Sequence, residues 1–203
     1  GTCVRIGFGG AVQRPLRWRA AELVAPLATA MFASSPLQGG GHEGFKSLRA
    51  RARSVAEPTR TGWAAAALLA GNGAGDPVEA YLDFALAARI VGVDHGGSYL
   101  QPARPLSFEQ WMEHGLEGRY PDLDDWRGHL GTLEPEVAPA AGVEFRGIDS
   151  LPSPFRSVPL VLLSAILTDP GTAQAVVDRL EPGAGQLAER WASAARSGLM
   201  EPD

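Results

Sequence analysis

The clearest alternation of apolar and polar residues in the chain lies between positions 142 and 149. Val143 and Phe145 are apolar, whereas Glu144 and Arg146 are charged and stand two residues apart. Residues i and i+2 of a β-strand point to the same face of its sheet. The pattern therefore predicts a strand with one apolar face, and with a carboxylate beside a guanidinium on the other face.

The Glu144–Arg146 pair has two interpretations. A carboxylate is a natural ligand for Mg²⁺, and a guanidinium is a planar fork suited to phosphate. On one rigid strand, the pair therefore suits a site for a nucleotide and its metal. The same two residues also suit a cross-strand ion pair on a solvated face. Their spacing leaves both interpretations open.

Apolar periodicity and capping residues divide the rest of the chain into short strands and helices. Alternation predicts a strand at Thr2–Ile6, another at Arg89–Val93, and a hairpin turn at 95–98 that leads to a return strand starting at Tyr99. Helices are predicted from Pro15 to about Ala33, from Asp76, from Ser107, from near Asp122, from about Phe155 to Leu167, from Asp169, and from about Gly185 to Ser197. This order predicts a single α+β domain over residues 1–203, with three or four strands and antiparallel neighbours.

Aromatic residues at helical spacing indicate core packing in two of the predicted helices. Phe108, Trp111 and Met112 follow a capping box, and we expect all three to face the core. Trp126 and His129 stand three residues apart on the next helix and therefore share a face.

Two segments have the composition of anion sites. The glycine run at 39–41 offers backbone N–H groups, but it lacks the GxxxxGK[ST] pattern, so we do not expect a phosphate-binding loop there. The segment 45–53 is basic, and we expect Arg51 and Arg53 on a solvated face. Arg60, in a loop with Thr and Gly, suits either an anion clamp or an ordinary surface position.

Composition excludes several classes of protein. The chain has 203 residues, of which 45% are apolar, and a net charge of −5, so it lacks the basic character expected of a nucleic-acid partner. Its single cysteine, Cys3, excludes an intramolecular disulfide and indicates a reducing, cytoplasmic setting. The longest apolar run, about 158–167, is too short to span a bilayer, so no membrane is expected as a partner.

The chain starts with Gly1, and a predicted strand follows at once. A strand needs a partner, and an unpaired edge favours association. We therefore expect a fragment, a processed product or one half of a larger protein, in a homo- or hetero-oligomer.

Short segments spread through the chain combine into a longer pattern. They are Met31–Pro36, Gly44–Arg49, Arg60–Gly62, Tyr81–Leu86, Trp126–Thr132, Glu134–Val137 and Glu144–Asp149. Their order and spacing resemble the glutamate–cysteine ligases of the plant and actinobacterial type, including the ergothioneine-pathway members. The resemblance covers about Thr2 to Pro170 and corresponds to the C-terminal half of such a ligase.

The resemblance implies part of a glutamine-synthetase-like catalytic fold, in which an antiparallel sheet with flanking helices curves around the active site. It implies that ATP, with Mg²⁺, phosphorylates the γ-carboxylate of L-glutamate, and that an amine such as L-cysteine then displaces phosphate. By position, the resemblance implies that Glu144 is a metal ligand and that Arg146 is a catalytic residue that contacts phosphate. It implies that Arg49 is a catalytic residue that binds a substrate carboxylate, and that Arg5 lies at a nucleotide-binding position. The residues implied to line the substrate site are Arg60, His129 and Thr132.

The chain departs from the family pattern at several of these places. Arg5 and Gly7 stand where the family's first strand has Gln and Asn, Ser34 stands for an Asn, and Arg53 for a Trp. The family's N-terminal half, with several metal-binding glutamates, is absent. Two hypotheses follow: a ligase that works with a companion N-terminal half, or a non-catalytic paralogue, a pseudoenzyme or regulatory subunit that binds a partner protein. A cation beside Mg²⁺ is repulsive, so Arg5 favours the second hypothesis. Glu144, Arg146 and Arg49 favour the first.

Overall fold

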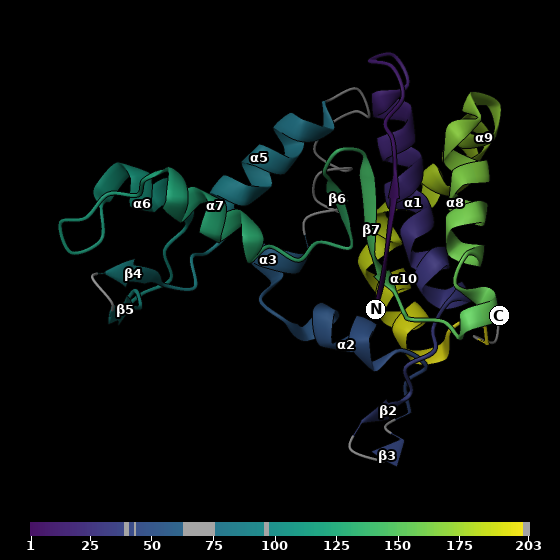
Figure 1. Ribbon diagram of the computed structural model, residues 1–203, viewed down its shortest axis with the longest axis horizontal. Coiled ribbons are helices and arrows are strands. Elements are labelled where there is room, and N and C mark those ends of the chain that lie inside the picture. The colour runs from purple at the N-terminus through teal and green to yellow at the C-terminus, as the bar shows by residue number, and fades with distance from the viewer. Residues whose placement is uncertain (39–40, 43, 63–75, 96–97, 201–203) are drawn as a thin grey trace.

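The computed structural model describes residues 1–38, 41–42, 44–62, 76–95 and 98–200, which form a mixed α+β fold (Figure 1). Its helices are α1 (Arg14–Met31), α2 (Leu48–Val55), α3 (Pro58–Thr61), α5 (Pro77–Ala87), α6 (Phe108–His114), α7 (Leu123–Gly131), α8 (Val158–Thr168), α9 (Pro170–Leu180) and α10 (Leu187–Ser197), with short 3₁₀ helices η1 (Ser153–Phe155) and η2 (Glu181–Gln186). Its strands are β1 (Thr2–Ile6), β2 (Leu37–Gln38), β3 (Gly41–His42), β4 (Val93–His95), β5 (Ser98–Leu100), β6 (Val137–Pro139) and β7 (Val143–Ile148).

The main sheet has three strands in the order β1-β7-β6, and both pairings are antiparallel. Arg5 of β1 lies opposite Glu144 of β7, while Val137 of β6 lies opposite Phe145. The predicted α+β class, the opening strand and the central strand are therefore confirmed. Two further hairpins, β2-β3 and β4-β5, stand apart from this sheet.

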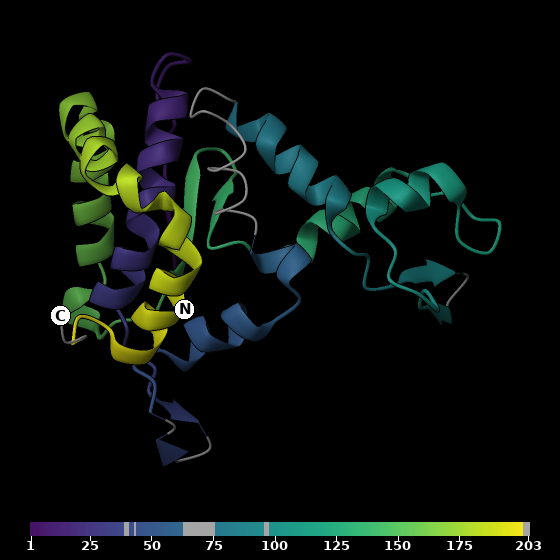
Figure 2. The ribbon, with the colours of Figure 1, turned by 180° about the vertical axis from the view of Figure 1, so that it is seen from behind.

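The main core lies between the sheet and α1. Leu23 of α1 and Phe145 of β7 are almost fully buried, and α8, α9 and α10 gather around α1 with buried Leu163, Leu167 and Leu187 (Figures 1 and 2). Burying one such side chain stabilises the fold by roughly 1.5–3 kcal/mol relative to leaving it exposed. The core thus fixes which face of β7 points away from α1.

Helix α1 follows the predicted bounds closely. Pro15 lies in its first turn, where the missing N–H removes no helical hydrogen bond. The helix continues through Pro26, which is buried. The small residues Ala21 and Ala25 are also buried on it, and their size lets neighbouring elements approach closely.

A second, smaller core lies at the other end of the molecule, between α6, α7 and β4 (Figure 1). Phe108 and Trp111 are buried there, with ring centroids 5.4 Å apart. The predicted capping box is confirmed, because Ser107 and Gln110 exchange side chain-to-backbone hydrogen bonds. The prediction for Met112 is wrong: the residue is 52% exposed, on the opposite side of this short helix.

The predicted strand at Arg89–Val93 is misplaced. Arg89 makes only an isolated bridge to Ser107, and the strand β4 starts at Val93. The return strand is confirmed as β5, so His95 ends a strand rather than lying in the turn.

The segment expected to be a plain glycine loop contains the β2-β3 hairpin. Residues 39 and 40, two of the three glycines in the run, lie outside the described residues.

The C-terminal part is helical as predicted, with η2 separating α9 from α10 at Pro182 and Gly183. Within the described ranges, no single helix is long and apolar enough to cross a membrane. The segments Ser153–Thr168 and Pro170–Ser197 reach that composition only as a pair bent by 92°. Their buried side chains, such as Leu163 and Leu187, contribute to the main core.

Candidate functional site

Glu144 lies between two guanidinium groups on the face of the sheet that points away from α1. Arg146, two residues along β7, donates from Nε to Glu144 Oε1 at 2.7 Å. Arg5, directly opposite on β1, donates from Nε to Glu144 Oε2 at 2.9 Å and makes a second contact through Nη2. The prediction that Glu144 and Arg146 share one face of the strand is confirmed, and Arg5 joins them there.

Exposure differs among the three members of this cluster, and Glu144 is its buried member. The side chain of Glu144 is 7% exposed, that of Arg146 26% and that of Arg5 56%. Burial by itself raises the pKa of Glu144, but the hydrogen bonds and charges of Arg5 and Arg146 outweigh burial and hold that pKa below its ordinary value. Glu144 is therefore an ionised carboxylate whose two oxygens both accept from arginine.

The connection between α7 and β6 is held by arginine side chains. Three guanidinium groups donate to its carbonyl oxygens: Arg60 to Thr132, Arg146 to Leu133 at 2.9 Å, and Arg53 to Glu134 at 3.0 Å. The backbone N–H of Arg146 donates to Glu136 O at 2.8 Å. These hydrogen bonds give the carbonyl groups partners that a strand would otherwise supply, so the arginines define the path of residues 132–136.

Arg49 of α2 completes the central strand. Its guanidinium donates to Ile148 O at 3.0 Å and also contacts Arg146 O. Both carbonyls belong to the part of β7 that lies past Val137, the first residue of β6, so β6 does not pair with them. Arg49 takes the place of a neighbouring strand there. Burial, together with the nearby charge of Arg53, lowers the pKa of Arg49 below its ordinary value.

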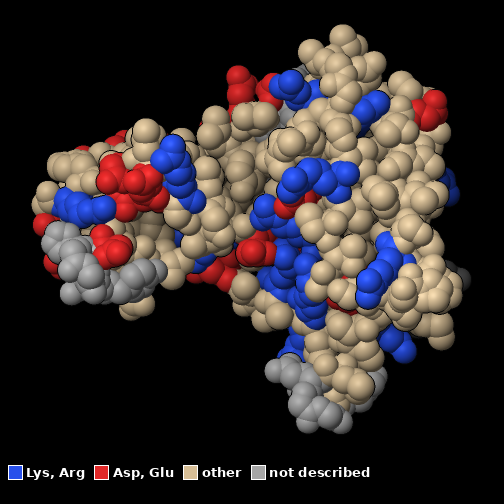
Figure 3. All heavy atoms as spheres, viewed as in Figure 1, with Lys and Arg blue, Asp and Glu red and all other residues tan. Residues whose placement is uncertain are grey.

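A pocket of about 420 Å³ opens between α2, α3 and the 132–136 connection. It is lined by Arg49, Ala52, Arg53, Ala56, Glu57, Arg60, Thr61, Thr132 and Glu134. We call it the arginine pocket. Figure 3 shows Lys and Arg atoms gathered in the middle of one face, with a few carboxylates among them, over the region where Figure 1 draws α2, α3 and the sheet. Three arginines against two glutamates favour an anionic ligand.

Three of the predicted substrate-binding residues, Arg49, Arg60 and Thr132, thus meet in one pocket. His129 does not line it. His129 is buried, its Nε2 lies 2.8 Å from Ala85 O, and its ring stacks on Trp126. Burial, with a smaller effect of the charge of Arg60, lowers the pKa of His129.

The sequence analysis missed Arg53. Its side chain is 15% exposed and bonds the Glu134 carboxylate, so the expected solvated position is wrong. A signal was present, because Arg53 follows Arg49 by four residues and α2 therefore presents both on one face. Arg51 is half-buried, with its guanidinium 4.6 Å from the ring centroid of Phe45.

Comparison with known proteins assigns this chain to a family. The sequence model of the glutamate–cysteine ligase family 2 matches residues 12–202. The chain belongs to that family. It is 32% identical over 182 residues to the chloroplastic glutamate–cysteine ligase of Solanum lycopersicum, covering 86% of this chain and 33% of the relative. It is 30% identical over 191 residues to the glutamate–cysteine ligase EgtA of Mycobacterium tuberculosis, covering 91% of this chain and 42% of the relative.

This family member therefore spans less than half of the length of each of these two relatives. The resemblance to the family is confirmed. The same identity level, 30%, is found for the chloroplastic ligase of Arabidopsis thaliana over 182 residues.

The described part of this family member does not by itself fit a magnesium site. Among the described residues, no three His, Cys, Asp or Glu side chains gather in one place. Glu144 is one carboxylate, and both of its oxygens are taken by arginine. A two- or three-metal centre needs more oxygen ligands than this cluster offers, so no step through a metal is derived from it.

Proposed function

We propose that this chain forms part of the active site of an ATP-dependent glutamate–cysteine ligase. The observation that carries the proposal is the arginine pocket, which brings Arg49, Arg60 and Thr132 together next to the Arg5–Glu144–Arg146 cluster. Family membership supports the reaction class. The proposal includes a glutamine-synthetase-like fold for the whole protein, to which the three-stranded sheet would contribute.

In the proposed reaction, a γ-carboxylate oxygen of L-glutamate attacks the terminal phosphorus of ATP, and the bond to ADP breaks. The amine nitrogen of L-cysteine then attacks the acyl carbon, phosphate leaves, and the nitrogen loses a proton. Both steps gather negative charge on a small volume, and fixed guanidinium groups stabilise such charge without reorganising.

The residues of this chain would divide that work by position. Arg49, Arg53 and Arg60 would hold carboxylate or phosphate oxygens in the arginine pocket, where Thr132 adds a hydroxyl group. Their positions are fixed in advance, because each guanidinium is already bound to a backbone carbonyl. Arg146 would contact phosphate from the adjacent strand. The Mg²⁺ that accompanies ATP would need carboxylates from a companion N-terminal half.

A second candidate is a non-catalytic family member that binds a partner protein. One observation favours it: Arg5 stands where the family has a neutral residue, and it occupies Glu144 Oε2. A carboxylate held by two guanidinium groups is a poor metal ligand, because the incoming cation must replace both. Under this proposal the cluster would serve only to hold β1 on β7.

Phosphate release separates the two candidates. Mixing the chain with Mg-ATP, L-glutamate and L-cysteine, alone and with a companion N-terminal half, should release phosphate in the ligase case. Glu144→Gln should then abolish the release, because Arg5 and Arg146 lose the carboxylate that orients both of them. Glu113→Gln is the matched control, since Glu113 lies on α6 and is 61% exposed.

Release that persists in Glu144→Gln would remove Glu144 from the mechanism. No release under any combination, from a chain that binds the companion half, would establish the non-catalytic alternative instead.

A further inference from the structure

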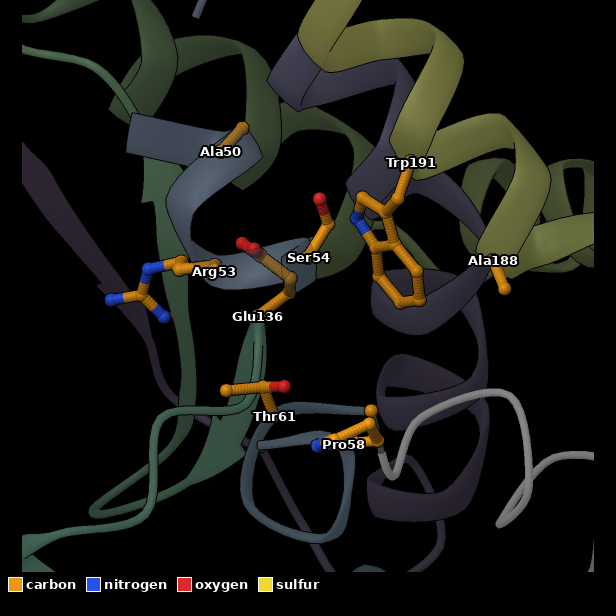
Figure 4. A pocket seen from close by; sticks show the side chains of 9 residues that line it. Ala50, Arg53, Ser54, Pro58, Thr61, Glu136, Ala188 and Trp191 are labelled. Carbon is orange, nitrogen blue, oxygen red and sulfur yellow. The ribbon is translucent and has the colours of Figure 1, made fainter. Parts of the chain in front are cut away.

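A second pocket, of about 290 Å³, lies on the other side of α2 from the arginine pocket, between α2, α3 and α10. Its walls are mostly apolar and include Pro58, Ala188 and the indole of Trp191 (Figure 4). Glu136 and Ser54 supply polar groups. We call it the tryptophan pocket.

Most polar groups of the tryptophan pocket already have partners. Ser54 donates to Arg51 O at 2.9 Å, and Thr61 donates to Glu57 O at 3.3 Å. Arg53 is bound to the carboxylate of Glu134. The positive charge at the rim of the pocket is therefore matched.

Two buried polar atoms of the lining have no hydrogen-bond partner among the described residues: Glu136 Oε2 and Trp191 Nε1. They come from distant parts of the chain, the residue before β6 and the middle of α10. Figure 4 shows the nitrogen edge of Trp191 turned toward Ser54, whereas the carboxylate of Glu136 points to the side of Arg53 and Ala50. A buried acceptor without a partner costs roughly 1–3 kcal/mol, so a ligand that donates to the Glu136 carboxylate gains that free energy, whereas the N–H of Trp191 needs an acceptor.

The surroundings of Glu136 indicate the charge that this ligand carries. Its carboxyl lies so close to Gly147 that a Cβ there would be 2.2 Å from Oε2. Burial raises the pKa of Glu136, although Arg53 and Arg49 oppose that shift. A cation or strong N–H donor therefore stabilises this carboxyl more than an anion can. The flat face of Trp191 is an additional partner for a cation.

We infer that the tryptophan pocket binds a small organic cation in which an ammonium or amidinium group is attached to an apolar ring. The cationic N–H groups donate to Glu136, and the ring lies against Trp191, Pro58 and Ala188. This site adjoins the arginine pocket, with which it shares Arg53 and Thr61, and the inference holds whether or not the chain is a ligase.

Benzylamine is a direct probe, and benzyl alcohol is its uncharged counterpart of the same shape. In ¹⁵N spectra of the full chain at pH 7, benzylamine should shift the indole N–H resonance of Trp191 saturably. The dissociation constant should be on the order of 1 mM, which is ordinary for so small a ligand. Benzyl alcohol should bind at least about 10-fold more weakly, because it cannot form a charge-assisted hydrogen bond to Glu136. Trp191→Phe identifies the resonance among the five tryptophans.

Glu136→Gln should weaken benzylamine binding about 10-fold and leave benzyl alcohol binding unchanged. Glu189→Gln, an exposed position two residues before Trp191 on α10, is the matched control and should change neither. Equal binding of the two probes to the wild-type chain, or saturation without a Trp191 shift, would overturn the inference. The comparison of probes on the wild-type chain decides the matter even if Glu136→Gln fails to fold.

Discussion

Two buried carboxyl groups in this chain have opposite surroundings. Glu144 accepts from Arg5 and Arg146, and these partners lower its pKa despite burial. Glu22, in the middle of α1, is fully buried, and neither of its oxygens has a partner among the described residues. Burial first, and the nearby Glu136 second, raise the pKa of Glu22 well above its ordinary value. The partner, and not the depth of burial, decides which form each carboxyl takes.

Removing one arginine should move the pKa of Glu144. In Arg5→Gln the pKa should rise, because one hydrogen-bonded cation is lost while burial stays. Stability contributed by this carboxylate is present above the unfolded pKa and is lost as pH falls through the lower folded pKa, so Arg5→Gln should lose less stability on acidification. A ¹³C titration of the Glu144 carboxyl measures the shift. Arg127→Gln, which removes the partner of the exposed Asp124, should leave the pKa of Glu144 unchanged.

Removing the charge of Glu22 should stabilise the fold at neutral and alkaline pH. Below the unfolded pKa near 4.5, Glu22 is neutral in both states, and Glu22→Gln should match the wild type. As pH rises towards the folded pKa, the unfolded chain releases the proton and the folded chain retains it, so the wild type loses stability. Urea unfolding at pH 8 should show Glu22→Gln more stable by roughly 1–3 kcal/mol. An advantage that is equal at pH 4 and pH 8 would contradict this account.

At the scale of single elements, the arginines of α2 and β7 replace backbone pairing that short strands cannot supply. β6 is short, running only from Val137 to Pro139. The connection before β6 and the C-terminal end of β7 therefore depend on side-chain donors. Close packing accompanies this arrangement. Gly147 of β7 leaves space that Glu136 and Thr29 occupy.

Adding a methyl group at Gly147 should therefore disturb this junction. In Gly147→Ala, the Cβ would lie 2.2 Å from Glu136 Oε2 and 2.8 Å from Thr29 Oγ1, so both side chains must move. We expect a loss of about 1–3 kcal/mol in the free energy of unfolding, measured by urea titration. Gly128→Ala is the matched control. A Cβ at position 128 meets nothing within 4 Å on the exposed side of α7. Gly128→Ala should therefore raise the free energy of unfolding by about 0.4–1 kcal/mol.

At the scale of the whole molecule, the described residues form two main cores of unequal size and a small third cluster of Ala85, Ala88 and Leu133. The larger joins the sheet to α1, α8, α9 and α10, and the smaller joins α6, α7 and β4. Tyr81 and Phe84 of α5 also pack against the larger core, while Leu86 packs against the smaller. α5 therefore connects the two cores.

The smaller core should open without the larger one. Trp111→Ala removes a buried ring that contacts Phe108 and donates to Arg119 O at 2.9 Å, a loss of roughly 3–5 kcal/mol in the core that it belongs to. Hydrogen exchange should then become faster in α6 and β4 and stay unchanged in β1 and β7. Met112→Ala, at a 52% exposed position on the same helix, should leave hydrogen exchange unchanged in all four elements. Faster exchange throughout both cores would show that they unfold as one unit.

Local chemistry made much of this fold predictable. Proline and aspartate start signals located α1, α7 and α9, and the capping box located α6, because these residues satisfy helix ends within a few positions. Alternation located β7 and its pair of charges. The resemblance of short segments identified the family. Predictions failed where neighbours far away in the chain decide, as at Met112, whose exposure depends on how a helix of two turns sits on its core.

The sequence by itself determined the helices and the central strand, the shared face of Glu144 and Arg146, and the family, because each depends on residues that are close together or on their order. Only the tertiary structure decided that Arg5 binds the same carboxylate, that Arg53 turns inward, and that His129 is buried away from the arginine pocket. Those outcomes depend on strand register and on helix packing. Both are set by contacts between residues far apart in the chain, such as Arg5 and Glu144 at a separation of 139 positions, which no local pattern encodes.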